Sequence, residues 1–114
     1  MNTMRNKVQL IGHLGMNPEI RIVGKGLKMA KIRMATSEVY TNGKGERITN
    51  TEWHNVVAWG KTAEIAEKLL QKGSEIVVDG RINNREYTSN DGAKRLFTEV
   101  VVNNLLVLER KRGS

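Results

Sequence analysis

Short runs of alternating apolar and polar residues, separated by turn signals, constrain the fold of this chain more than any other feature. In the clearest run, Ala30, Ile32 and Met34 alternate with basic residues. A period of two places apolar side chains on one face of a β-strand and polar side chains on the other. The sequence therefore predicts short strands, each with one buried face.

The pattern repeats along the chain and is interrupted once by a helical segment. We expect strands at residues 7–14, 28–36, 51–59, 75–87 and 94–108, a short extension at 19–23, and a helix at 61–70. The helix would bury the apolar stripe Ile65, Ala66, Leu69 and Leu70 and end at Gly73 as a left-handed cap. The pair Asn103 and Asn104 is expected to kink the last strand.

Three strands, a helix and two more strands are the element order of the OB-fold. The prediction is thus an all-β, five-stranded Greek-key barrel with one helix between strands 3 and 4, and a small α+β meander is the alternative. A length of 114 residues fits one domain. We place it at residues 1–108, followed by a short basic C-terminal end at 109–114.

Composition excludes several classes of site. The chain has no cysteine, so disulfides, thiol catalysis and cysteine-ligated metals are ruled out. The two histidines, His13 and His54, have no accompanying cluster of acidic residues, and no catalytic constellation is found. We therefore expect a protein that is not an enzyme and carries no metal or cofactor.

The N-terminus leads into no signal-like apolar stretch, and no apolar run approaches the length of a membrane span. We expect a soluble, cytoplasmic protein with no membrane partner.

Positive charge is concentrated at the two ends of the sequence. The formal net charge is +7. Residues 1–38 contain seven basic and two acidic residues, residues 39–109 are nearly balanced, and residues 110–112 are all basic. A basic segment of this kind indicates a polyanionic partner such as nucleic acid.

The aromatic residues favour a single-stranded partner. Trp53 and Trp59 fall on one face of their strand together with Asn55, which a buried core would disfavour. Tyr87 shares a face with basic residues, and Tyr40 opens a Gly/Lys loop. Aromatic rings beside basic side chains stack bases and hold phosphates without sequence preference. The fifth aromatic residue, Phe97, is not among the expected stacking residues.

A series of short motifs stands in order along the chain, and none is diagnostic alone. They are Asn6-Lys7-Val8, Gly12 to Gly15, Pro18-Glu19, Ala35-Thr36-Ser37-Glu38, Thr51-Glu52-Trp53-His54, Val56-Val57, Gly60-Lys61, Ala63-Glu64, Lys72-Gly73-Ser74, Gly80 and Thr98-Glu99-Val100-Val101-Val102. In these motifs the sequence resembles the bacterial single-stranded DNA-binding protein (SSB) family over residues 5 to about 108.

The resemblance implies a homotetrameric OB-fold protein that wraps single-stranded DNA in replication, recombination and repair, in the cytoplasm at the nucleoid. The family's stacking positions match Tyr40, Trp53, Trp59 and Tyr87, with tyrosine at two positions where many members have tryptophan. The position that matches His54 lies at a subunit interface in the family. This agrees with its place on the strand face opposite the tryptophans.

Phosphate contacts are expected from eight basic residues. Two of them, Lys61 and Lys72, match the family's backbone-contacting lysines, and the others follow from charge placement and the strand pattern. The full set is Lys7, Arg21, Lys31, Arg33, Lys61, Lys72, Arg81 and Arg85.

Two departures from the family pattern stand out. Asn55 and Glu86 occupy positions where relatives often carry basic residues, which would weaken the phosphate contacts. The acidic tail through which family members dock replication and repair proteins is not found in these 114 residues. Either the sequence is a truncated or short form or the protein lacks that recruiting function, so docking through the tail is not carried over. The alternatives are a replication-restart accessory or RNA-binding OB protein, or a structural OB subunit that binds no DNA.

Overall fold

The computed structural model describes residues 5–109. Within them, six strands and one helix form: β1 (Val8–Leu14), β2 (Glu19–Val23), β3 (Leu27–Thr41), β4 (Arg47–Trp59), α1 (Lys61–Leu69), β5 (Glu75–Thr88) and β6 (Lys94–Glu109). The predicted order of elements is confirmed. The expected short extension at residues 19–23 is a separate strand, β2, and the hairpin of β3 and β4 is longer than expected. The expected basic end beyond residue 109 lies outside the described residues.

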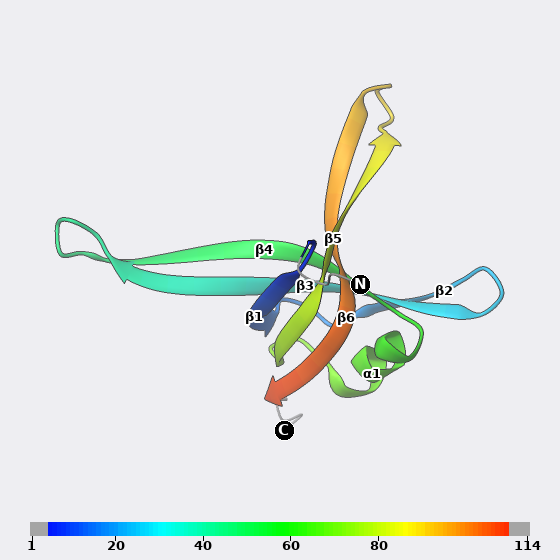
Figure 1. Ribbon diagram of the computed structural model, residues 1–114, viewed down its shortest axis with the longest axis horizontal. Coiled ribbons are helices and arrows are strands. Elements are labelled where there is room, and N and C mark those ends of the chain that lie inside the picture. The colour runs from blue at the N-terminus through cyan, green and yellow to red at the C-terminus, as the bar shows by residue number, and fades with distance from the viewer. Residues whose placement is uncertain (1–4, 110–114) are drawn as a thin grey trace.

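Five strands close into a barrel, as the OB-fold prediction requires. The sheet order is β1-β5-β6-β4-β3-β2, and an additional pairing between β1 and β3 closes it. The only parallel contact in this part of the chain joins β4 to β6, where Val56 and Val57 lie opposite Val100 and Val101. Three hairpins project from the barrel: β3–β4 to the left, β5–β6 upward, and β2 with the start of β3 to the right (Figure 1).

The alternating apolar residues fill the barrel as predicted. Ala30, Ile32 and Met34 of β3 are at most 2% exposed, and Ile76 and Val78 of β5 are fully buried. The outward residues of the same strands carry the charges. The alternation in the sequence therefore fixes which side of each strand meets solvent.

The predicted apolar stripe of α1 is confirmed for Ala66 and Leu70 and wrong for Ile65 and Leu69. Ala63, Ala66 and Leu70 are buried, whereas Ile65 and Leu69 are 42% and 37% exposed. The helix covers the barrel mainly through alanines, and small side chains allow a close approach. Gly73 does not cap the helix either, since Leu70 is the C-cap and the Gly73 N–H donates to the Leu14 carbonyl of β1 at 2.9 Å.

The last strand bends where the two asparagines stand. Asp79 pairs with Asn104 and Gly80 with Val102, so Asn103 is the extra residue of a β-bulge. The two backbones come close here, because a Cβ on Gly80 would lie 2.2 Å from the Val101 carbonyl oxygen. Beyond the barrel, residues 83–99 form the projecting hairpin, called the arm below.

Candidate nucleic-acid interface

The outer sides of β4 and β3 form one continuous surface that carries both tryptophans. Trp53 lies opposite Ala35, and Trp59 lies opposite Met29. Directly paired residues of antiparallel strands share a face. Trp53 is 50% exposed and Trp59 38%, which confirms that neither fills the core. This surface, called the tryptophan face below, consists of Trp53, Asn55, Val57 and Trp59 and the β3 residues paired with them.

Basic side chains lie between the two indoles. Lys31 pairs with Val57, and Arg33 pairs with Asn55. Six residues of a strand span about 20 Å at roughly 3.3 Å per residue. The tryptophan face therefore offers an aromatic ring at each end of a basic stretch long enough for several nucleotides.

The ring of Trp53 is held by two neighbours. The guanidinium carbon of Arg33 lies 5.5 Å from its centroid, within cation–π range. Gly15 packs against the ring so closely that a Cβ there would lie 2.4 Å from Cζ3. Arg33 Nη1 also donates to Asn55 Oδ1 at 3.5 Å. The indole is therefore positioned before any ligand binds.

The arm supplies a second wall. Its register places Phe97 opposite Arg85, Tyr87 opposite Arg95, and Glu99 opposite Asn83, all on one face. The guanidinium carbon of Arg85 lies 5.4 Å from the centroid of Phe97. Glu99 is buried, and its Oε1 atom has no partner with hydrogen-bond geometry. Arg85 Nη2 lies 2.9 Å from this oxygen, so the ion pair with Arg85 is what compensates its negative charge.

Three adjoining hollows join the two walls into one groove. The first, of about 190 Å³, lies between Lys31 and Arg33 on the tryptophan face and Arg85 and Phe97 on the arm. The second, of about 390 Å³, is lined by Trp53 and Phe97. The third, of about 340 Å³, adds Tyr87. Phe97 lines all three, so an aromatic residue left out of the expected stacking set lies at the centre of the groove.

The structure brings together Trp53, Lys31, Arg33, Arg85 and Tyr87 of the expected residues. Trp59 lies on the same face but lines none of these three hollows.

Tyr40 is placed differently. It pairs with Ile48, and strand alternation puts it on the side of β3 opposite Lys31 and Arg33. Tyr40 is 51% exposed on the projecting β3–β4 hairpin, so a strand could reach it only by crossing that hairpin.

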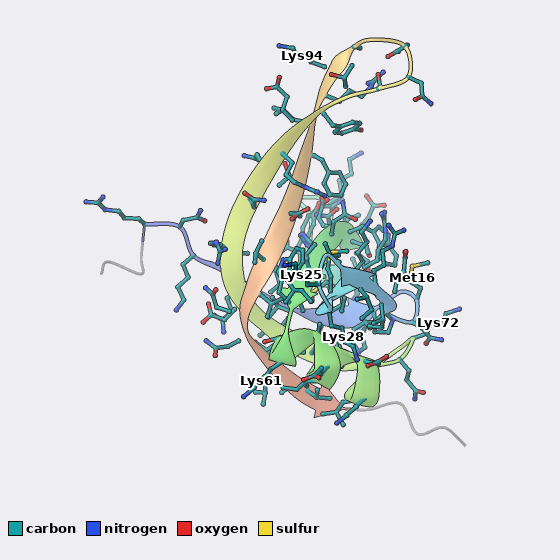
Figure 2. The ribbon with its side chains drawn as sticks, turned by 90° about the vertical axis from the view of Figure 1, so that its right-hand side faces the viewer. Met16, Lys25, Lys28, Lys61, Lys72 and Lys94 are labelled. Atoms are coloured by element: carbon teal, nitrogen blue, oxygen red, sulfur yellow. The ribbon has the colours of Figure 1, made fainter. Side chains whose placement is uncertain are left out.

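The remaining cations do not line these three hollows. Lys61, the first residue of α1, lies towards the end of the molecule opposite Lys94, which is at the tip of the arm (Figure 2). Lys72 lies at the side of the molecule near Met16, where its backbone N–H donates to Asn17 Oδ1 at 2.7 Å. Three others have local partners: Lys7 lies 3.7 Å from Asp79, Arg21 pairs with Glu19, and Arg81 donates to Asn103.

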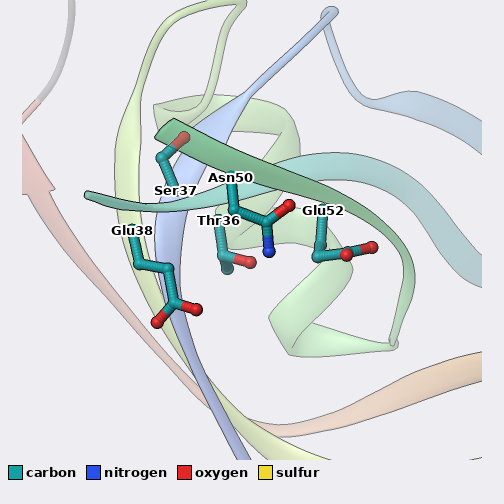
Figure 3. A pocket seen from close by; sticks show the side chains of 5 residues that line it. All are labelled: Thr36, Ser37, Glu38, Asn50 and Glu52. Carbon is teal, nitrogen blue, oxygen red and sulfur yellow. The ribbon is translucent and has the colours of Figure 1, made fainter. Parts of the chain in front are cut away.

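His54 lies on the side of β4 opposite Trp53, as expected. Its Nε2 is 2.8 Å from Thr36 Oγ1, and the residue is partly buried. Further along this side, Thr36, Ser37, Glu38, Asn50 and Glu52 line a polar hollow of about 250 Å³ (Figure 3). This hollow has two carboxylates and no basic residue, whereas in the first hollow of the groove Lys31, Arg33 and Arg85 outnumber the two carboxylates, which favours the tryptophan face for a polyanion.

Other kinds of site are not seen in the described residues. Between residues 5 and 109, no group of three or more histidine, aspartate or glutamate side chains could hold a metal ion. In the same part of the chain, no helix is long and apolar enough to cross a membrane.

Comparison with known proteins adds independent information. Residues 5–108 match the sequence model of the Single-strand binding protein family. The single-stranded DNA-binding protein of Neisseria meningitidis serogroup A is 41% identical over 103 residues, which are 90% of this chain and 59% of that protein. Single-stranded DNA-binding protein 1 of Chlorobaculum tepidum is 40% identical over 107 residues, 93% of this chain and 66% of that protein. The chain thus spans about three-fifths to two-thirds of the length of these relatives.

Two solved structures are similar in fold. The Plasmodium falciparum SSB complex with ssDNA superposes with a TM-score of 0.86 at 29% identity, covering 96% of this chain and 100% of that one. A deletion mutant of the single-stranded DNA binding protein from Thermus aquaticus gives 0.79 at 32% identity, covering 95% of this chain and 52% of the other. Both support the OB-fold assignment.

Proposed function

The chain belongs to the single-strand binding protein family, and we propose that it binds single-stranded DNA without sequence preference. The family consists of non-enzymatic DNA-binding proteins. The observation that carries the proposal is the pair of exposed tryptophans on a basic face that forms one wall of a groove. In this role the protein would coat and protect single strands during replication, recombination and repair.

Two kinds of contact account for binding without base readout. Lys31, Arg33 and Arg85 line the groove and would neutralise phosphates. Trp53 and Trp59 would stack bases, and each stacked base contributes about 1–3 kcal/mol whatever its identity. Specific hydrogen bonds to base edges are not required.

The path of a longer strand extends beyond the groove. Tyr87 on the arm and Tyr40 on the β3–β4 hairpin would stack further bases. Peripheral phosphate contacts would come from the cations outside the groove. They are Lys7, Arg21, Lys61, Lys72 and Arg81.

Self-assembly is part of the proposal. The outer side of β1, β5 and β6 exposes an apolar row, since Ile11 pairs with Val77 and Val77 with Leu106. Ile11 is 53% and Leu106 59% exposed, and a contiguous exposed apolar row of this kind would fit a contact with another subunit. We propose a homo-oligomer, a tetramer by family resemblance, with His54 at a subunit contact.

The domain limits and the cellular location are also part of the proposal. Residues 1–108 would be the DNA-binding domain and residues 109–114 a basic end, in a cytoplasmic protein associated with the nucleoid.

The test measures binding of a fluorescein-labelled dT oligonucleotide by anisotropy. Unlabelled single-stranded DNA of mixed sequence, the same sequence as a duplex, and the same sequence as RNA serve as competitors at one salt concentration. We expect the single-stranded DNA to compete regardless of sequence and the duplex to compete poorly. Equal or better competition by RNA would favour an RNA-binding OB protein, and no binding at all would favour a structural subunit.

A further inference from the structure

Phe97 occupies a position that the other aromatic residues do not share. It lies on the inner face of the arm and lines all three hollows of the groove. The side chain is partly exposed rather than packed into the barrel, and it is not part of the core cluster. Its burial is therefore not what holds the fold together.

The largest of the three hollows lies between Phe97 and Trp53. Its volume of about 390 Å³ falls within the range of ligand-binding pockets. Asn55 and Thr98 also line it and provide polar groups beside the rings. Arg85 is not among its lining residues, so Phe97 can be reached from this side without displacing the guanidinium.

Arg85 supports the ring from elsewhere. Its guanidinium carbon lies 5.4 Å from the Phe97 centroid, and its Nη2 lies 2.9 Å from the buried carboxylate of Glu99. Because Glu99 is only 5% exposed, its side chain is a fixed anchor for a cation that is itself largely solvent-accessible. The anchored cation limits the freedom of the ring, as preorganised binding requires.

We propose that Phe97 is a further base-contacting residue, with a nucleobase of the bound strand inserted between Phe97 and Trp53. Arg85 backs the Phe97 ring, and Glu99 holds Arg85 in place. The inference rests on the proposed function and adds a second aromatic wall to the groove. Any base can take this position, since every base has a π-face.

The first experiment compares variants in the anisotropy assay. Phe97→Ala should weaken binding of a dT oligonucleotide about 5- to 140-fold, the range for loss of one stacked base. Phe97→Leu keeps an apolar side chain of similar size but no π-system, and should also weaken binding. Phe97→Trp should bind at least as well as the unaltered chain. Ile65→Ala, which trims an exposed aliphatic side chain on α1, is the control and should change nothing.

The second experiment uses the unaltered chain and does not depend on any variant folding. An oligonucleotide containing 5-iodouracil is irradiated in the complex, and the cross-linked tryptic peptides are sequenced by mass spectrometry. We expect a cross-link at Phe97, in the peptide that begins at Leu96, besides cross-links at Trp53. A complex that forms but shows no cross-link at Phe97, together with wild-type affinity of Phe97→Leu, would overturn the inference and leave the proposed function intact. Failure of the unaltered chain to bind would overturn both.

Discussion

The close packing of Gly15 against Trp53 leads to a sharp prediction. A Cβ at position 15 would lie 2.4 Å from Cζ3 and 2.6 Å from Cη2 of the indole. Ordinary contact begins near 3.4 Å, so Gly15→Ala must displace the ring by about 1 Å. Gly15 is not among the glycines with positive φ, so alanine adds no backbone strain at this position. The substitution therefore acts mainly through the position of the ring.

We expect Gly15→Ala to weaken binding of a dT oligonucleotide by part of one stacking contribution, about 1 kcal/mol or roughly fivefold. Gly43→Ala is the matched control, because a Cβ there meets nothing within 4 Å and the backbone needs no positive φ. Anisotropy titrations give the affinities, and thermal unfolding shows whether each variant is folded.

A double-mutant cycle tests the reasoning itself. A phenyl ring at position 53 lacks the part of the indole that meets Gly15, so Gly15→Ala should cost almost nothing in the Trp53→Phe background. Equal losses in both backgrounds would refute the claim that Gly15 acts by positioning the indole. An unchanged affinity in the single variant would refute it as well.

Three further substitutions test the groove and the fold. Glu99→Gln removes the charge that anchors Arg85 behind the Phe97 ring, so single-stranded DNA should bind a few-fold more weakly; unchanged or tighter binding would contradict the anchoring role of Glu99. Lys31→Ala should make the negative slope of log affinity against log salt shallower by about 0.7, because one phosphate contact is lost. Lys68→Ala on the exposed face of α1 should leave the slope unchanged. Gly80→Ala should lower the free energy of unfolding by about 2–4 kcal/mol in denaturant titrations, because its Cβ would lie 2.2 Å from a carbonyl oxygen; a change below about 0.5 kcal/mol would contradict the close strand crossing.

Much of the barrel could be read from the sequence because inward and outward residues alternate. Ala30, Ile32 and Met34 indicated the buried side of β3. Trp53 and Trp59 were predicted to share one face of the neighbouring strand β4, and this is its outer side. Alternation is a local signal that depends only on which side of a strand meets solvent. Alternation can therefore be recognised in the sequence without knowledge of the tertiary structure.

The helix face and the length of the hairpin depend on packing that local patterns do not report. Ile65 and Leu69 are more apolar than Ala63, yet only the alanine fits against the barrel. Likewise β3 and β4 remain paired out to Thr41 and Arg47, beyond the barrel, where no alternation of apolar residues marks them.

Phe97 shows how the site was only partly predictable. In the sequence it stands between Leu96 and Thr98, and Arg95, two residues earlier, is a basic neighbour on the same strand face that could have indicated a site. Its pairing with Arg85 depends on the register of the β5–β6 hairpin, and its approach to Trp53 brings together two hairpins that are far apart in the chain. Contacts of that kind appear only once the barrel is assembled.

The central claim is that exposed tryptophans and groove cations hold single-stranded DNA. It is tested most directly by titrating intrinsic tryptophan fluorescence with poly(dT) at several salt concentrations. Stacking of bases on Trp53 and Trp59 predicts strong quenching. Each phosphate contact contributes roughly −0.7 to the slope of log affinity against log salt. The three groove cations therefore predict a slope of about −2 or steeper. An unquenched signal with no salt-dependent binding would contradict the account and leave the tryptophan face as a surface for protein contacts.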